Sequence, residues 1–346
     1  MADSSDICPC PLPLSSALCP PTSDLDFRMP FSLRATARAP GSIGNLGPGL
    51  DILGCAVEGA CDSVTAEFVD QPGIVVLDAG HPELSTNPDE HASALAALAV
   101  VKRASSLGAM PSSGIALRVT KGLPLSAGQG GSAASAVAGA VAVNALIGSP
   151  LGRDDLLEAA LAAETRVAGR HLDNIAPSLM GGIVLIRSLD PIDVLSIPVP
   201  DNLYVVLASP AQNMRTAEAR SVLPKQVPLD VALHQAAQVA AIVAALFGGD
   251  IGLLGRAIDD RIAEPSRAGL LKGFTEAKQA ALDAGALGVS ISGSGPTAFA
   301  VCSAAPAAEN VAHAMQDAYE RIGLVCRARV CRPDRVGTRI DTFPRT

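Results

Sequence analysis

The glycine-rich segment at residues 123–135 has the residue types and spacing best suited to chemistry in this chain. It reads LPLSAGQGGSAAS and runs from an expected strand through Gly128, Gly130 and Gly131 into an expected helix at Ser132. Glycine lets the backbone lie close against a polyanion, and the free N–H groups of a first helical turn then point at it. The segment therefore predicts a phosphate-binding loop. It matches neither GxxxxGK[ST] nor GxGxxG, and a flexible helix entry is the alternative interpretation.

A second loop, dense in glycine and proline, is suited to binding a small polar molecule. It reads PGSIGNLGPGLDILG over residues 40–54 and contains Asn45 and Asp51. Backbone restriction of this kind fixes where one amide and one carboxylate point, which favours a binding role. The alternative is a structural turn held by Asx hydrogen bonds.

Glu164 is the candidate metal ligand. Leu157, Leu161 and Glu164 share one helical stripe, which places a carboxylate on the face expected to be buried. A buried carboxylate needs a cation, and Mg²⁺ would bridge it to the phosphates of a bound nucleotide. The alternative is a carboxylate near the helix end that reaches solvent or pairs with Arg166 or Arg170.

Three further features have both a structural and a functional interpretation. The segment HLDNIAPSLMGG at residues 171–182 contains Asn174 in an Asp-Asn pair, which usually ends a helix. The segment SISGSGPT at residues 290–297 is a second glycine-rich turn, for which a simple hairpin suffices. Arg220 and Arg267 would ordinarily be solvated surface residues.

Composition excludes several classes of protein. Hydrophobic residues make up 49% and charged residues 17%, so the chain as a whole is globular rather than disordered. The formal charge of -8, without a basic run, disfavours a nucleic-acid partner. The expected apolar runs are shorter than the ~20 residues that cross a bilayer, so we expect no membrane anchor and a cytoplasmic location. The cysteines and histidines show no structural zinc spacing.

The expected elements divide the chain into a tail and two domains. Residues 1–28 are rich in Pro, Ser and Cys and predict a disordered tail, followed by domains at 29–198 and 199–346. Strands are expected at 31–39 (an edge strand), 64–68, 74–77, 115–120, 183–187, 204–208, 289–292, 298–301 and 324–329. Helices are expected at 88–107, 132–146, 154–168, 230–247, 275–283 and 305–321. This order predicts an α+β sandwich with helices packed on an antiparallel sheet.

Together these segments resemble the homoserine kinases of the GHMP kinase superfamily, from about residue 34 to residue 332. The phosphate loop and the GSGP turn are superfamily features, whereas NLGPGLDILG, HLDNIAPSLMGG and TAEARSVLP are similar to the homoserine kinase versions. The resemblance implies a two-domain GHMP kinase fold of the α+β class, in which the N-terminal domain is like ribosomal protein S5 domain 2 and the C-terminal domain is ferredoxin-like. ATP would lie in the groove between them.

The resemblance also implies an activity and a set of site residues. The activity is ATP-dependent phosphorylation of the L-homoserine side-chain hydroxyl to O-phospho-L-homoserine, in threonine biosynthesis, by a homodimer. The implied ATP-binding residues are Pro124, Leu125, Ser126, Ala127, Gly128, Gln129, Gly130, Gly131, Ser132, Ala133 and Ala134. The implied Mg²⁺ ligands are Ser132 and Glu164. The implied homoserine-binding residues are Asn45, Asp51 and Asn174 at the hydroxyl and amine, and Thr216, Arg220 and Arg267 around the carboxylate. Asp51 and Asn174 are also the implied catalytic residues, with Asp51 an orienting acceptor rather than an obligatory base.

Two departures from the family pattern leave alternatives open. Gly131 stands where a serine usually precedes Ser132, and Gln129 stands where leucine is usual. The interval from Glu164 to Asn174 is one residue shorter than the pattern predicts. The alternative functions are a GHMP kinase for another alcohol, such as a mevalonate-pathway enzyme, and an inactive protein that binds ATP or acts as a scaffold.

Overall fold

Two β-sheets organise the part of the chain that the computed structural model describes, residues 34–109 and 113–343. These residues belong to one unit, Phe31–Thr346. The predicted tail at residues 1–28 lies outside the described residues. The first sheet has the order β11-β1-β2-β4-β3, with β5 paired to β2 and β6 to β5; the second has the order β10-β7-β9-β8.

Runs of strands and runs of helices follow one another along the chain. The first sheet contains β1 (Arg34–Gly44), β2 (Leu53–Val69), β3 (Ile74–Asp78), β4 (Gly114–Thr120), β5 (Ile183–Leu189), β6 (Ile192–Ile197) and β11 (Arg339–Phe343). The second contains β7 (Tyr204–Pro210), β8 (Gly288–Ile291), β9 (Ala298–Cys302) and β10 (Cys326–Cys331). The helices are α1 (Ala92–Ser106), α2 (Gly131–Leu146), α3 (Arg153–Val167), α4 (Ile175–Met180), α5 (Thr216–Ser221), α6 (Leu229–Gly248), α7 (Ile251–Ala257), α8 (Ala263–Ala268), α9 (Phe274–Asp283) and α10 (Ala305–Arg321).

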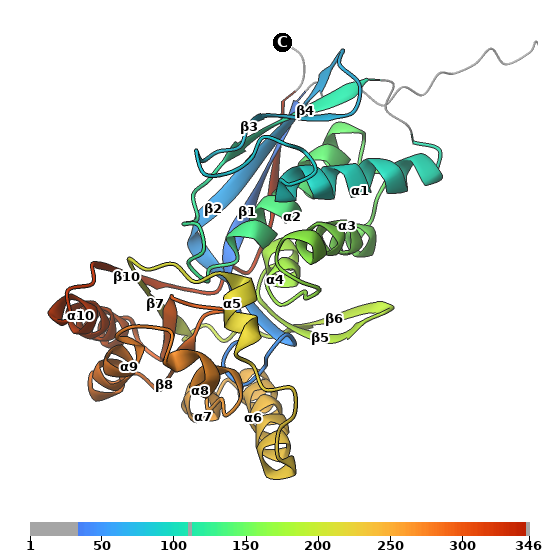
Figure 1. Cartoon of the computed structure of the whole chain (residues 1–346). Helices are drawn as coiled ribbons and strands as arrows, with labels where there is room; N and C mark the ends of the chain where they lie inside the picture. The colour runs from blue at the N-terminus through green and yellow to red at the C-terminus, as the bar shows by residue number, and fades with distance from the viewer. Residues whose placement is uncertain (1–33, 110–112, 344–346) are drawn as a thin grey trace, which may run out of the picture. The chain divides into compact units, whose positions relative to one another are not determined.

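Helices α1 to α4 lie together on one side of the first sheet (Figure 1). At their centre is α2, whose Ala and Val side chains are buried around the helix, as its composition predicts. Gly139 allows the close contact with α1, because a Cβ there would stand 2.4 Å from the Ser93 carbonyl oxygen. This packing fixes the position of the N-terminus of α2.

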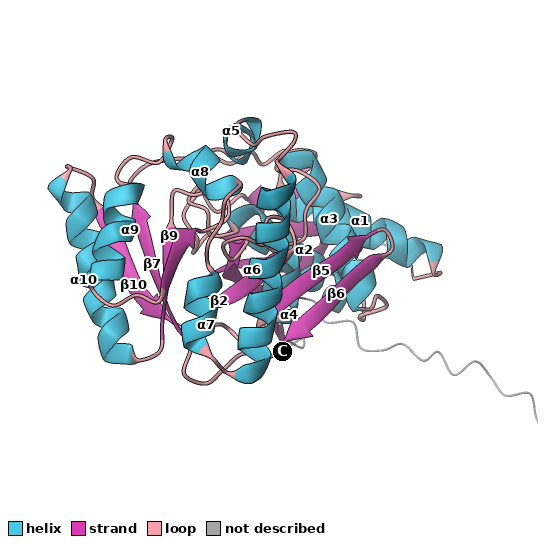
Figure 2. Ribbon diagram, turned by 90° about the horizontal axis from the view of Figure 1, so that it is seen from below, coloured by secondary structure: helices cyan, strands magenta, loops and turns pink. Residues whose placement is uncertain are grey.

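The second sheet is covered on both faces. Helices α9 and α10 pack on one face, and α6 and α7 lie on the other (Figure 2). The cluster beneath α6 and α7 also contains Ile43, Leu53 and Ile183 from the first sheet. One apolar core therefore joins the two sheets next to the Asn45–Asp51 loop.

Several sequence-based expectations are wrong in detail. β1 is an interior strand, since it pairs with both β2 and β11, and it extends through Gly44, so the expected loop at 40–54 is shorter. β3 and β4 are parallel in a sheet expected to be antiparallel. The short elements α4, β6, α5, α7 and α8 and the C-terminal strand β11 were not expected, because a few residues give little periodic signal. β11 returns the chain end to the first sheet; the domain boundary near residue 198 stays a prediction.

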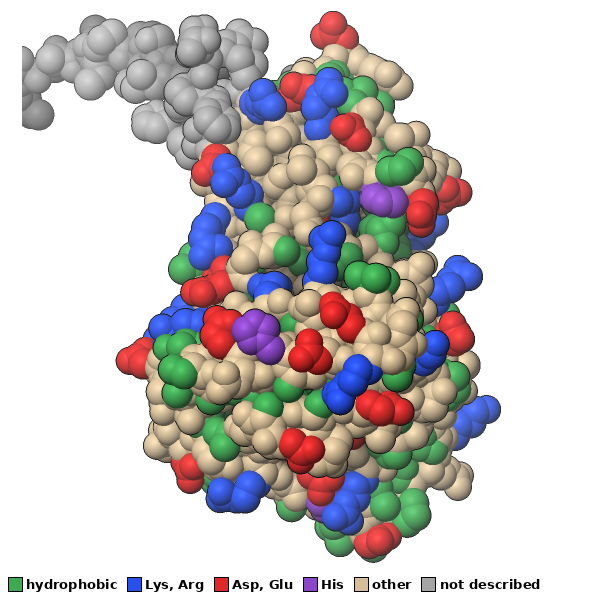
Figure 3. All heavy atoms as spheres, turned by 90° about the vertical axis from the view of Figure 1, so that its left-hand side faces the viewer, with side chains coloured by type: hydrophobic (Ala, Val, Ile, Leu, Met, Phe, Trp, Pro, Cys, Tyr) green, Lys and Arg blue, Asp and Glu red, His purple; other side chains and the backbone are tan. Residues whose placement is uncertain are grey.

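Among the described helices, α6 is long and apolar enough to cross a membrane by length and composition. It also contains Asp230, His234 and Gln235, and the Gln235 amide donates to the Pro48 carbonyl oxygen at 3.0 Å. A single helix of this kind is weak support for a membrane span, so the absence of a membrane anchor stays a prediction. On the face shown in Figure 3, acidic and basic side chains are interspersed, which is typical of a solvated surface.

Candidate active site

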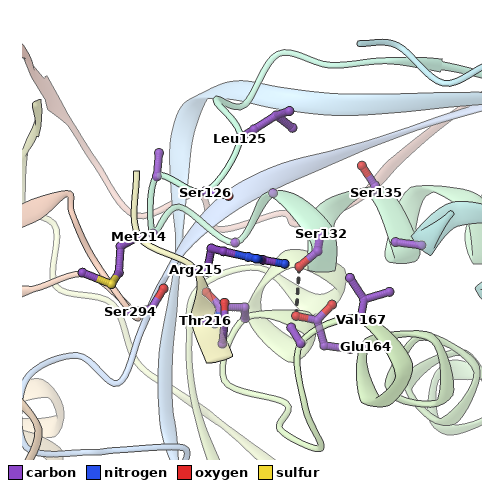
Figure 4. Close-up of a pocket in the computed structure, with 18 of the residues that line it drawn as sticks. Leu125, Ser126, Ser132, Ser135, Glu164, Val167, Met214, Arg215, Thr216 and Ser294 are labelled. Atoms are coloured by element: carbon purple, nitrogen blue, oxygen red, sulfur yellow. Dashed lines mark hydrogen bonds between the residues drawn. The ribbon is translucent and has the colours of Figure 1, made fainter. Parts of the chain in front are cut away.

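A cleft of about 440 Å³ collects most of the predicted site residues (Figure 4). Those that line it are Asn45, Asp51, Pro124, Leu125, Ser126, Ala127, Gly128, Gly130, Gly131, Ser132, Glu164, Asn174, Thr216, Arg220 and Arg267. They come from loops and helix ends that are far apart in the sequence. The tertiary structure therefore unites segments that the sequence could only associate by resemblance.

The two glycine-rich turns hold each other in place. Gly128 has a φ of 73°, and a Cβ there would lie 2.5 Å from the Ser292 carbonyl oxygen. The Ser292 hydroxyl donates to the Gly128 carbonyl oxygen at 2.6 Å, and the Thr297 N–H donates to the Ala127 carbonyl oxygen at 3.2 Å. The hairpin at residues 290–297 thus also supports the phosphate loop, residues 124–134.

Within the phosphate loop, the left-handed residue Gly130 is the N-cap of α2. Gly130 has a φ of 68°, and a Cβ there would lie 2.3 Å from the Ser42 hydroxyl oxygen. The first N–H groups of α2 have no acceptor within the helix, and the helix dipole adds positive potential at this end. Because Gly130, Gly131 and Ser132 all line the cleft, the site fits an anion such as a nucleotide phosphate.

Three of the predicted ATP-binding residues do not line the cleft. Ala133 and Ala134 are fully buried in the core beneath the first sheet. The Gln129 side chain is also buried, and its Nε2 donates to the Ser209 hydroxyl at 2.8 Å. These three side chains therefore do not face the cleft, and contact of these positions with the nucleotide stays a prediction.

The predicted metal ligands are in direct contact. The Ser132 hydroxyl donates to Glu164 Oε1 at 2.9 Å, as the dashed line in Figure 4 shows. Glu164 is 2% exposed, and its Oε2 has no partner among the described residues. Burial raises the pKa of Glu164, although His171 and the Ser132 hydroxyl act in the opposite direction. The alternative of a solvated or Arg-paired carboxylate is therefore wrong.

A hydroxyl and a buried carboxylate with a free oxygen are a donor set that suits a hard cation such as Mg²⁺. Among the described residues, no group of three or more His, Cys, Asp or Glu side chains could hold a metal ion. Ser132 and Glu164 would therefore share the cation with phosphate oxygens and water.

His171 and Asp173 are site residues to which the sequence interpretation gave no role. Both are buried and line the cleft, and His171 Nδ1 lies 3.1 Å from Asp173 Oδ1. Burial alone lowers the pKa of His171, but the adjacent Asp173 carboxylate, with the charge of Glu164, outweighs it and raises the pKa. Their position in the HLDN motif is the sequence feature from which both residues could have been predicted to belong to the site.

Lys121 is another residue that the sequence interpretation missed, since it precedes the glycines. Its ammonium group pairs with Asp62 and donates to the Gly131 carbonyl oxygen at 3.1 Å and the Ser135 hydroxyl at 3.0 Å. It is almost fully buried. These contacts fix the start of α2 against β2 and β4.

Asn45 holds three segments together on the other side of the site. Its Oδ1 accepts from the Asp51 N–H at 3.1 Å, and its Nδ2 donates to the Gly293 carbonyl oxygen at 3.0 Å. Its own N–H donates to Asp173 Oδ2 at 3.1 Å. Asn45 and Asp51 both have positive φ, so the loop directs the Asp51 carboxylate by backbone geometry as well.

Two arginines line the same part of the cleft as Asp51. Arg220 binds the Asp51 carboxylate with both terminal nitrogens, at 2.5 and 3.2 Å. Arg267 is 3% exposed and donates to the carbonyl oxygens of Ala219 at 3.1 Å and Gly293 at 2.8 Å. Burial and the nearby Arg220 charge lower the pKa of Arg267. The interpretation of Arg267 as a solvated surface residue is therefore wrong, and paired guanidinium groups in a cleft suit a carboxylate ligand.

Asn174 and Thr216 also lie in the cleft. Asn174 Oδ1 accepts from the Ser42 hydroxyl at 3.0 Å, and Gly44 permits this approach, because a Cβ at Gly44 would lie 2.6 Å from Asn174 Nδ2. Thr216 is the first residue of α5 (Figure 4). Their roles toward a substrate stay predictions.

Comparison with known proteins places the chain in a family. The model of the GHMP kinase N-terminal domain matches residues 92–182, and that of the GHMP kinase C-terminal domain matches residues 240–321. The homoserine kinase of Arabidopsis thaliana is 43% identical over 87% of this chain and 83% of its own length. The homoserine kinase of Chloroherpeton thalassium is 38% identical over 89% of this chain and 99% of its own length.

Solved structures agree with this placement. The crystal structure of homoserine kinase from Cytophaga hutchinsonii has a TM-score of 0.85 and 37% identity, and covers 92% of this chain and 100% of that one. The L. major mevalonate kinase, with a TM-score of 0.65 and 18% identity over 86% of this chain and 95% of that one, shares the fold alone. The two-domain α+β fold is thus confirmed, and the chain belongs to the homoserine kinase family of the GHMP kinases.

Proposed function

We propose that this chain transfers the terminal phosphoryl group of ATP to the side-chain hydroxyl of L-homoserine, giving O-phospho-L-homoserine for threonine biosynthesis. The observation that carries the proposal is the joining, in one cleft, of the α2 N-terminus with Asp51 and two arginines. The α2 N-terminus suits a phosphate chain, and the two arginines suit the carboxylate of an amino acid.

In this proposal the residues near α2 bind the nucleotide. The N–H groups at residues 130–132 hold phosphate oxygens, and Ser132 with Glu164 holds Mg²⁺. When bound, MgATP supplies the phosphoryl group and the metal neutralises part of its charge. Lys121 keeps the start of α2 in position through its bond to the Gly131 carbonyl oxygen.

The residues around Asp51 bind and orient the amino acid. Arg220 and Arg267 hold the carboxylate, while Asp51 and Asn174 orient the hydroxyl and amine. Since Arg220 already pairs with Asp51, a substrate carboxylate would take over part of the Arg220 fork and release Asp51 to accept from the substrate. Alignment and charge neutralisation supply most of the catalysis of phosphoryl transfer, so Asp51 acts as an orienting acceptor.

One assay tests the proposal: ADP release from MgATP with homoserine, mevalonate or shikimate as acceptor. We expect release above background with homoserine and background rates with the other two alcohols. Release with mevalonate but not homoserine would support another GHMP kinase activity. Tight ATP binding without release for any acceptor would support the inactive ATP-binding or scaffold protein.

The assembly and location of the protein are also part of the proposal. A homodimer and a cytoplasmic location stay predictions from the family resemblance. Sedimentation of the purified chain at several concentrations checks the first, and fractionation of the source cells checks the second.

A further inference from the structure

Arg215 is the cation of the cleft that is free to meet a ligand. Four Lys and Arg side chains line the cleft within the described residues, and three are held by protein groups. Lys121 is bound by Asp62, Arg220 by Asp51, and Arg267 by two carbonyl oxygens. Arg215 is exposed, and its side chain has no hydrogen-bond or ion-pair partner in the described part of the chain.

The backbone on the N-terminal side of Arg215 is anchored to the phosphate loop. The Met214 N–H donates to the Ser126 carbonyl oxygen at 3.2 Å, and the Met214 side chain is 4% exposed. The Arg215 backbone is extended, with φ -76° and ψ 136°, and Arg215 is the N-cap residue of α5. This anchor places the base of the Arg215 side chain at the rim of the phosphate-binding half of the cleft.

The Arg215 side chain lies in the same cleft as the metal ligands. In the view of Figure 4 it points in the direction of Ser132 and Glu164, and all three residues line the cleft. A guanidinium group offers a planar fork of donors that suits phosphate oxygens and keeps its charge at any physiological pH. The phosphate loop supplies backbone N–H groups but no lysine or arginine of its own.

We propose that Arg215 is a catalytic residue that contacts the terminal phosphoryl group of ATP, a role that rests on the proposed kinase activity. The N–H groups of α2 are fixed in the backbone, whereas the Arg215 guanidinium is carried by a side chain. Negative charge is spread over the oxygens of the transferring group in the transition state, and an arginine at that position stabilises it.

Equilibrium binding tests the contact without turnover. Titration calorimetry measures the Mg²⁺ complexes of AMP-PNP and ADP with wild type, Arg215→Gln, Arg215→Lys and Arg166→Gln. The last variant makes the same charge change at an exposed position of α3 outside the cleft lining. We expect Arg215→Gln to weaken AMP-PNP by about ten-fold or more and ADP by less than about two-fold, because only AMP-PNP has the third phosphoryl group. Arg215→Lys should lie between the two, and Arg166→Gln should match wild type.

Turnover supplies the second readout. If the contact strengthens in the transition state, Arg215→Gln lowers kcat while the homoserine KM stays near wild type. Equal weakening of AMP-PNP and ADP would overturn the assignment, as would wild-type affinity for both or a defect confined to homoserine KM. Nucleotide binding needs no homoserine, so the two proposals can fail separately. A chain that binds AMP-PNP but phosphorylates another alcohol would refute the proposed function. The AMP-PNP and ADP affinities would still decide whether Arg215 contacts the terminal phosphoryl group.

Discussion

Gly130 and Gly131 are adjacent residues with opposite steric requirements. Gly130 has positive φ and no room for a Cβ, whereas a Cβ at Gly131 would meet Lys121 Nζ no closer than 3.5 Å. The serine usual at Gly131 in related phosphate loops would therefore fit here. The absence of that hydroxyl is a difference in chemistry rather than in shape.

We predict that Gly131→Ala stabilises the protein by about 0.5–1 kcal/mol, because alanine restricts the unfolded chain and fits the first helical turn. Gly130→Ala should destabilise it by at least about 1–2 kcal/mol, because the left-handed conformation and the Ser42 hydroxyl oppose a Cβ. Urea unfolding of both variants measures the difference. A destabilised Gly131→Ala would show that the start of α2 needs glycine for another reason.

Glu164 carries a prediction that separates a metal ligand from a structural carboxylate. Glu164→Gln should raise the Mg²⁺ concentration for half-maximal turnover by about ten-fold or more, since one charged ligand is lost. Its melting temperature should not fall, because a neutral amide is less costly to bury than a carboxylate without a cation. An unchanged Mg²⁺ requirement together with a large loss of stability would assign Glu164 a purely structural role.

Arg267 is predicted to bind the substrate carboxylate. Arg267→Gln should raise the homoserine KM by about ten-fold or more, because a charge-assisted hydrogen bond is lost. The ATP KM should stay near wild type, since the phosphate loop binds the nucleotide separately. Arg256→Gln on α7, an exposed position outside the cleft lining, is the matched control. An ATP-specific defect would instead place Arg267 in the nucleotide half of the site.

At the scale of elements, Asp334 fixes the connection between β10 and β11. Its carboxylate accepts from the N–H groups of Val336 and Gly337 at 2.9 and 3.0 Å and from Arg339 at 2.9 and 3.1 Å. Burial alone raises the pKa of Asp334, but Arg339 and the two N–H groups outweigh it and lower the pKa below its ordinary value of 3.8. The carboxylate therefore stabilises the return of the chain to the first sheet.

We predict that Asp334→Asn destabilises the protein by about 1–3 kcal/mol at pH 7. Because the pKa is lowered in the folded state, this stabilisation is fully present above the ordinary pKa and is lost as the pH falls through the folded-state value. The difference between wild type and variant should thus be constant from pH 7 to about pH 5 and shrink below about pH 4. Urea unfolding across this range measures it, with Asp341→Asn, at a half-exposed position of β11 that pairs with Arg38, as control. A difference that grows on acidification would contradict the assignment.

At the scale of the whole molecule, the N-terminal segment is predicted to be dispensable. Residues 1–28 are rich in Pro, Ser and Cys, and this composition predicts that they bury too little apolar surface to contribute to packing. A chain beginning at Met29 should keep the melting temperature and turnover of the full chain. A large loss of either would show that the segment packs on the rest of the protein or acts in catalysis.

The sequence by itself determined the elements with a strong local signal. The apolar composition of α2 predicts a helix buried on all sides, and the glycines before it predict a phosphate loop, because both depend on neighbouring residues. The polar motifs, through their resemblance to a family, also indicated the fold and which side chains belong to one site.

Only the tertiary structure decided how those side chains are used. Gln129 turns inward although it lies among loop residues, and Arg267 is buried although an isolated arginine is usually solvated. Lys121 pairs with Asp62 of β2, which is distant in sequence, and Arg215 lines the same cleft as the phosphate loop. Burial and charge pairing arise from the packing of residues far apart along the chain, so the local sequence around each of them does not contain this information.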